Sequence, residues 1–233
     1  MTRPQAKRTL GALGICAGLM ALAPWSGLAQ STLEPDDYVS DRNLTPGPAK
    51  PAEDPLGPRR HFRVPNPANI SDDDAQKAYN ALITAMARGY GMSEDPAAEA
   101  YTSWKRYNTA PYLSAGHGRR FLNTYGNAIA KDYGKYEAAG RFPVGSILAK
   151  DSMAITEDGK VNPGPLFLME KMADGFNHVS GDWKYSMIMP DGSIFGVTKG
   201  TGSKQVEFCV PCHLAAEKND HLHFLPKRLR ITE

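Results

Sequence analysis

The sequence Cys209-Val210-Pro211-Cys212-His213 lies twenty residues before the end of the chain. Two cysteines separated by two residues and followed at once by a histidine are typical of covalent attachment of a c-type haem. Each thiol adds to one vinyl group of the porphyrin, and the spacing lets both sulfurs reach one edge of the ring. His213 then comes beneath the iron and offers a ring nitrogen as the proximal axial ligand. We therefore expect one covalently bound haem, held by Cys209, Cys212 and His213.

The same cysteine spacing has two other interpretations. A C-x-x-C pair also occurs in redox-active dithiols and as one half of a zinc site. The sequence contains 3 cysteines, and the third, Cys16, is not part of a second C-x-x-C pair. The missing second pair disfavours zinc, and the histidine directly after Cys212 favours haem over both alternatives.

The N-terminus has the organisation of a secretory signal peptide. Basic residues within the first eight positions precede an apolar stretch at 10–23 and small residues at 27–29. The apolar stretch is too short for a convincing transmembrane helix. We expect export to the periplasm, with residues 1–29 removed by cleavage near Ala29.

The charge balance excludes a nucleic-acid-binding class. The chain has 27 basic and 25 acidic residues. The first 29 residues hold three of the basic ones and no acidic ones, so the remaining 204 residues carry 24 basic and 25 acidic side chains. This balance leaves no excess of basic residues with which to bind nucleic acid. Both cysteines that remain after cleavage belong to the haem motif, so no disulfide framework is expected.

The expected mature chain is divided into an arm and a domain. Residues 30–70 are rich in Pro, Asp and Gly and show no helical or strand periodicity, which predicts a flexible arm or linker. An arm that wraps a partner subunit is the alternative. Residues 71–233 are long enough for one domain, which we expect to hold the haem.

Two helices are expected in this domain. Ser71 is a good N-cap, the acidic residues after it favour a helix start, and Gly89 would end the helix. A second helix is expected at 128–139, with Ile129, Tyr133 and Tyr136 on one side.

An antiparallel sheet is expected after the second helix. Alternating residues predict strands at 145–151, 183–189 and 193–198, and the turn Pro190-Asp191-Gly192 joins the last two. Residues 166–172 fit either a strand or a helical turn. The predicted fold class is α+β, a mainly antiparallel β-sheet domain with a few flanking helices and a C-terminal haem attachment site.

Four runs before the haem motif resemble the cytochrome P460 family, which includes the β-sheet cytochromes c′. They are RFLNTYGN at 120–127, FPVGSILAK at 142–150, GPLF at 164–167 and GDWKY at 181–185, in the family's order. The resemblance extends from about residue 101 to the C-terminus and leaves out the arm and the first helix. It implies a compact, mainly antiparallel domain that forms a homodimer and binds a five-coordinate haem.

The resemblance also assigns a role to Lys150. In P460 proper, a lysine at the end of a G-T/S-x-x-x-K strand bonds covalently to a meso carbon of the porphyrin, and Lys150 matches that position. Alternation places Lys150 on the same strand face as Leu148, so its side chain is able to point inward. Burial beside a haem would lower its pKa towards the neutral amine that a nucleophile requires. A solvated lysine at the end of a strand is the alternative.

Other residues are candidates for the distal side of the haem, the face of the iron opposite His213. P460 proper has a distal carboxylate shortly before the haem motif, and Glu207 is the only acid at 198–208, with a surface carboxylate as the alternative. His221 and His223 follow the motif too closely to reach that face easily. His117, on a glycine-containing loop, is the best candidate for a sixth ligand, although surface histidines are common.

Three functions are compatible with these features of the sequence. The first, which we predict, is oxidation of hydroxylamine to nitric oxide or nitrous oxide, with a soluble electron-transfer partner as acceptor. The second is binding of nitric oxide or a similar gas, as in the cytochromes c′-β. The third is electron transfer by a six-coordinate cytochrome c. A distal acid would favour the first, an aromatic or aliphatic cap the second, and a bound His or Met the third.

Overall fold

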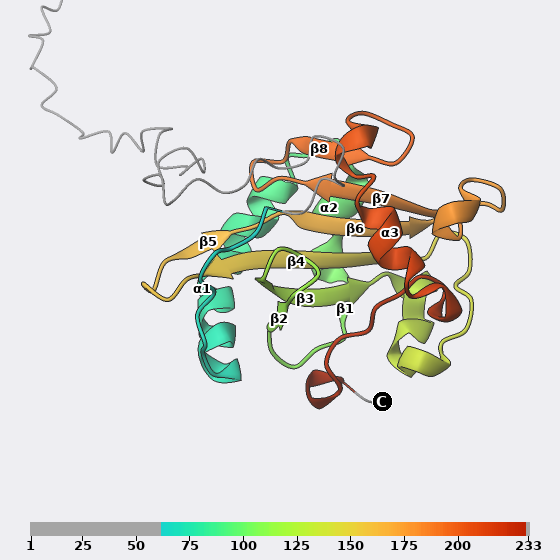
Figure 1. Cartoon of the computed structure of the whole chain (residues 1–233). Coiled ribbons are helices and arrows are strands. Elements are labelled where there is room, and N and C mark those ends of the chain that lie inside the picture. The colour runs from blue at the N-terminus through green and yellow to red at the C-terminus, as the bar shows by residue number, and fades with distance from the viewer. Residues whose placement is uncertain (1–61, 232–233) are drawn as a thin grey trace, which may run out of the picture. The chain divides into compact units, whose positions relative to one another are not determined.

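The computed structural model describes residues 62–231, which form an eight-stranded antiparallel sheet flanked by helices (Figure 1). This confirms the predicted α+β class. The signal peptide and the arm up to residue 61 lie outside the described residues. The strands are β1 (Lys105–Arg106), β2 (Tyr112–Ser114), β3 (Arg120–Gly126), β4 (Ile147–Ile155), β5 (Val161–Pro163), β6 (Leu166–Lys171), β7 (Trp183–Ile188) and β8 (Ile194–Val197). Their order is β1-β3-β4-β6-β7-β8, with β2 also paired to β3 and β5 to β4.

The two faces of the sheet carry separate hydrophobic clusters. Because successive strand residues point to opposite faces, Leu148 joins one cluster and Ala149 joins the other. Helices α1 (Asp72–Tyr90) and α2 (Pro96–Ala100) cover the Ala149 face. Helix α3 (Cys209–Leu214) and the chain after it cover the Leu148 face, where α3 is seen crossing the sheet in Figure 1.

Helix α1 begins as predicted and ends slightly later. The Ser71 side chain accepts a hydrogen bond from the backbone N–H of Asp74, and three aspartates occupy the first turn. Gly89 lies inside the helix, and Gly91 caps it. A Cβ at Gly89 would lie 1.9 Å from the Pro190 carbonyl oxygen, so glycine is needed here for close packing against the turn between β7 and β8.

The second predicted helix is a kinked 3₁₀ segment, η4 (Ala128–Ala138). The chain leaves helical geometry at Tyr136, whose φ is 52°, and the Tyr136 hydroxyl donates to the Ile231 carbonyl. Tyr133 and Tyr136 are buried, but Ile129 is 47% exposed. The prediction that the three residues lie on one side of a regular helix was therefore wrong, because non-helical geometry at Ala130 and Tyr136 breaks the periodicity.

The described end of the Pro-rich segment packs on the domain. Val64 and Ala68 are buried, and Pro67 forms an isolated bridge with Thr156 of the β4–β5 turn. The backbone N–H of Val64 donates to the Gly118 carbonyl at 2.8 Å. Residues 62–70 thus contribute contacts to the folded domain, which begins before Ser71.

Asp151 is a buried carboxylate on the α1 side of β4. It accepts hydrogen bonds from the hydroxyls of Tyr79 (2.6 Å) and Tyr101 (3.3 Å) and from the side-chain amide of Asn123 (3.2 Å). Burial raises its pKa from the ordinary value of 3.8 to about 6, and these hydrogen bonds partly oppose the rise.

The raised pKa of Asp151 predicts that the free energy of unfolding falls as the pH rises from about 4 to about 6. In this range the unfolded chain has released the proton that folded Asp151 still holds, so rising pH favours unfolding. A shift of about two pKa units corresponds to about 3 kcal/mol. Asp151→Asn keeps an oxygen acceptor for Tyr79 and should flatten this part of the curve. Urea unfolding of both proteins across the range tests the prediction, and an unchanged slope in the variant would contradict it.

Candidate haem-binding site

Helix α3 places the haem motif against the sheet. Cys209 and Cys212 are three residues apart, so their sulfurs lie on one face of the helix. Both cysteines and His213 line a cavity of about 490 Å³, within the usual range for ligand pockets. Pro211 fits in the first turn of α3, where a backbone N–H has no helical partner. Cys209 is partly buried, Cys212 is exposed, and the two form no disulfide.

His213 is oriented for metal ligation. It is buried, and its Nδ1–H donates to the backbone carbonyl of His221 at 2.7 Å. Burial, assisted by the nearby charge of Lys150, lowers the pKa of His213 to about 3, which keeps the imidazole neutral. With the proton on Nδ1, Nε2 carries the lone pair that a metal requires. The Tyr185 ring packs beside the imidazole, with the ring centres 5.2 Å apart.

A buried ion pair holds the loop that orients His213. Lys171 Nζ lies 2.6 Å from the Asp220 carboxylate, and the two side chains are 2% and 10% exposed. The other Asp220 carboxylate oxygen accepts from the Phe142 backbone N–H at 2.8 Å, and the Asp220 carbonyl accepts from the indole N–H of Trp183 at 2.8 Å. Asp220 and His221 both have positive φ, a turn that places the His221 carbonyl against His213. Sequence reasoning missed this support, because Lys171 and Asp220 look like ordinary surface charges.

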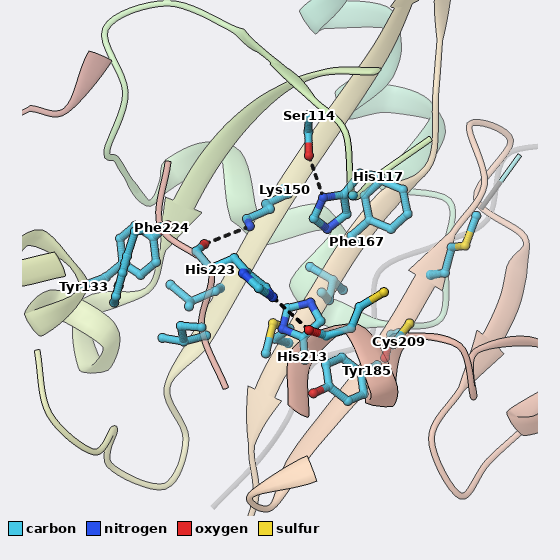
Figure 2. Close-up of a pocket in the computed structure, with 18 of the residues that line it drawn as sticks. Ser114, His117, Tyr133, Lys150, Phe167, Tyr185, Cys209, His213, His223 and Phe224 are labelled. Atoms are coloured by element: carbon cyan, nitrogen blue, oxygen red, sulfur yellow. Dashed lines mark hydrogen bonds between the residues drawn. The ribbon is translucent and has the colours of Figure 1, made fainter. Parts of the chain in front are cut away.

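Lys150 points into the same cavity. It is 9% exposed and lines the pocket with Cys209, Cys212 and His213, on the Leu148 face of β4 as the alternation predicts. Its Nζ makes a long hydrogen bond, 3.4 Å, to the His223 carbonyl (Figure 2). Burial lowers the pKa of Lys150 to about 8, so a neutral amine is accessible near neutral pH.

The other candidate residues are divided between the cavity and the surface. Glu207 is exposed and is not among the described residues that line the cavity, so its position does not support the expected distal carboxylate. It lies two residues before α3, the helix that carries His213. His117 lines the cavity from the loop between β2 and β3. His223 is exposed, and its Nε2–H donates a hydrogen bond to the Cys212 carbonyl (2.8 Å), beside α3.

The walls of the cavity are mainly apolar and aromatic. The lining residues include Tyr112, Leu148, Phe167, Leu168, Met169, Met187, Leu222 and Phe224. Among the polar groups, the Tyr185 hydroxyl is buried and finds no hydrogen-bond partner in the described part of the chain. An unpaired buried hydroxyl costs about 1–3 kcal/mol, which a bound group with an oxygen acceptor would relieve. Two thiols, one neutral imidazole and an apolar slot suit the macrocycle of a haem.

The zinc and dithiol alternatives fit this site less well. Within residues 62–231 no group of three or more His, Cys, Asp and Glu side chains is arranged to hold a metal ion. Redox-active C-x-x-C pairs depend on a cysteine with a depressed pKa. Here burial raises the pKa of the Cys209 thiol to about 12.

A C-terminal haem motif on an antiparallel sheet defines a class of cytochromes distinct from the small helical ones. The family model for cytochrome P460 matches residues 98–224, which contain the sheet, α3 and Lys150. The chain belongs to the cytochrome P460 family, as the sequence resemblance predicted, and this family implies a c-type haem with iron. A comparison with curated proteins found no match. In the described residues no helix has the length and apolar character needed to span a membrane.

Proposed function

We propose that this chain is an exported monohaem cytochrome of the P460 type that oxidises hydroxylamine. The observation that supports the proposal most strongly is the burial of Lys150 in the cavity that Cys209, Cys212 and His213 line. When bound, the haem iron supplies the site at which hydroxylamine binds and loses electrons. Oxidation of one hydroxylamine to nitric oxide releases three protons and three electrons. A soluble redox protein is the electron acceptor in this proposal.

The side chains of the site have separate roles. Cys209 and Cys212 would anchor a porphyrin through thioether bonds, and His213 would offer Nε2 to its iron. Lys150 lines the same cavity and would be the amine available for a cross-link to the macrocycle. The apolar walls exclude water and strengthen electrostatic interactions inside the cavity.

A gas-binding function is the second candidate. No acidic side chain is among the described residues that line the cavity, whereas Phe167 and several aliphatic residues are. An apolar pocket of this kind suits nitric oxide or another neutral diatomic molecule better than it suits proton-coupled chemistry. The two candidates share the haem site and differ in whether electrons leave the substrate.

Lys150→Arg distinguishes the cross-linked from the unlinked haem. Arginine keeps the positive charge but is not a nucleophile near neutral pH. We expect the dithionite-reduced wild-type protein to show a Soret band far to the red of an ordinary ferrous c-type haem. The variant should lose this shift, retain covalent haem and oxidise hydroxylamine at least tenfold more slowly. Lys160→Arg, at an exposed lysine, is the matched control. Identical spectra of wild type and Lys150→Arg would exclude the cross-link and leave gas binding as the better function.

A further inference from the structure

His117 lies across the cavity from the proximal histidine. The ring centres of His117 and His213 are 6.5 Å apart, with the planes at 72°. His117 comes from the β2–β3 loop and His213 from α3, so the two rings approach from different elements (Figure 2). The Phe167 ring, 4.9 Å from His117, packs beside it.

Both imidazoles use Nδ1 in a hydrogen bond to the protein. In His213 this nitrogen donates to the His221 carbonyl, and in His117 it lies 3.0 Å from the Ser114 hydroxyl. A hydrogen bond at Nδ1 is the usual arrangement for a histidine that ligates a metal through Nε2. The same arrangement therefore occurs on both sides of the cavity.

The separation of the rings suits one metal ion between them. A metal–imidazole bond is about 2 Å long and the ligating nitrogen lies about 1 Å from its ring centre, so two imidazoles on opposite sides of one ion have centres about 6 Å apart. The observed 6.5 Å is close to this value. His223 is nearer to His213, at 5.4 Å, but its Nε2 is bonded to the Cys212 carbonyl on the α3 side.

The His117 loop is fixed by the segment that precedes the domain. Val64 donates its backbone N–H to the Gly118 carbonyl, and the Arg119 guanidinium donates to the Pro65 carbonyl at 2.7 Å. Gly118 and Arg119 both have positive φ, which turns the chain sharply beside His117. Residues 62–67 lie outside the part of the chain that the family model matches. This segment thus provides a local means of holding a histidine at the cavity.

We propose that His117 Nε2 is the second axial ligand of the haem iron, opposite His213. The resting haem is then six-coordinate and low-spin, in contrast to the five-coordinate haem that the family resemblance implies. Hydroxylamine or a gas must displace His117 to reach the iron. The inference rests on haem attachment through Cys209, Cys212 and His213, and a His117 that no small molecule displaces would favour the electron-transfer function over the other two.

Spectroscopy of the holoprotein tests this ligand directly. Electron paramagnetic resonance and absorption spectra of the ferric wild type should show a low-spin haem, and His117→Ala should convert it to high spin. Added imidazole should restore the low-spin spectrum of His117→Ala, which a purely structural role would not produce. Binding of carbon monoxide to the ferrous protein should be at least tenfold faster in His117→Ala, because no ligand has to leave.

Two further variants make the assignment specific. Arg119→Ala removes the contact with Pro65 and should give a mixture of spin states, whereas His223→Ala should remain low-spin. A high-spin wild type that His117→Ala does not change would overturn the proposal. So would a low-spin signal that survives His117→Ala and is lost in His223→Ala. Absence of covalent haem after denaturation would instead refute the haem function itself, so the two failures are distinguishable.

Discussion

Replacement of both Cys209 and Cys212 by serine is expected to abolish thioether attachment of the haem while the domain remains folded. The thioether bonds require sulfur, and a serine hydroxyl does not add to a vinyl group under the same conditions. Cys212 is exposed and Cys209 is only partly buried, so serine is tolerated sterically at both positions. The cavity, His213 and Lys150 are unchanged in this variant, so any haem that still binds is held without thioether bonds.

The measurement is haem that stays with the chain after denaturation, by peroxidase staining of a denaturing gel and by mass. We expect wild type to retain one haem per chain and the double variant to retain none through thioether bonds, so that only a Lys150 cross-link would keep haem on the denatured chain. Each single variant should keep one thioether bond, and its pyridine haemochrome band should move to the red because one vinyl group remains unsaturated. Val210→Ala, between the two cysteines, is the control with both thiols intact. Haem that resists denaturation in the double variant would point to Lys150 as an independent attachment point.

Strands could be predicted from the sequence where residue types alternate along the chain. β7 and β8 were expected close to their observed bounds, because alternation and the turn at Pro190-Asp191-Gly192 mark them. The sequence of β6 fits either a strand or a helical turn, because Leu166, Phe167, Leu168 and Met169 are all buried. β3 is buried along nearly its whole length as well. Strands covered on both faces read as continuous apolar runs, which carry no periodicity.

The candidate site was predictable as far as it is contiguous in sequence. The haem motif occupies five consecutive residues, and the Lys150 position follows from a short strand motif. The ion pair of Lys171 and Asp220 joins residues 49 positions apart and has no local signal. The loop of His117 is brought to the cavity by the register of β2 and β3, in which Ser114 pairs with Arg120. In the sequence, a histidine between two glycines gives no indication that it lies at the cavity.

The position of Glu207 shows how a family pattern misleads when only spacing is compared. Glu207 was selected because it is the one acid shortly before the haem motif. That position lies two residues before α3, the element that carries the proximal ligand, and the side chain is exposed. The cavity is lined instead by His117 of the β2–β3 loop and Phe167 of β6, which would be on the distal side of the proposed haem.

Lys171→Met is expected to lower the free energy of unfolding by about 3–5 kcal/mol, the usual cost of removing one partner of a buried ion pair. Methionine fills most of the volume of the lysine side chain, but it leaves the Asp220 carboxylate without its charged partner in a largely buried position. The Gly181 carbonyl also loses the donor that lies 2.7 Å away. Since Asp220 and His221 form the turn that receives the His213 Nδ1–H, the loss extends to the orientation of the proximal ligand.

The expected result therefore has a spectroscopic part as well as a stability part. Chemical denaturation of the holoprotein should show the loss of stability. On the His117→Ala background, where the ferrous iron is five-coordinate, the iron–histidine stretching band in resonance Raman spectra should broaden or shift. Lys184→Met is the matched control, because its ion pair with Glu170 is on the same sheet but 25% and 30% exposed. Such an exposed pair contributes less than about 1 kcal/mol. Asp220→Asn keeps an acceptor for Phe142 and, combined with Lys171→Met, should recover part of the loss because no charge stays buried. Equal losses in Lys171→Met and Lys184→Met would show that the buried pair does not hold the His213 loop.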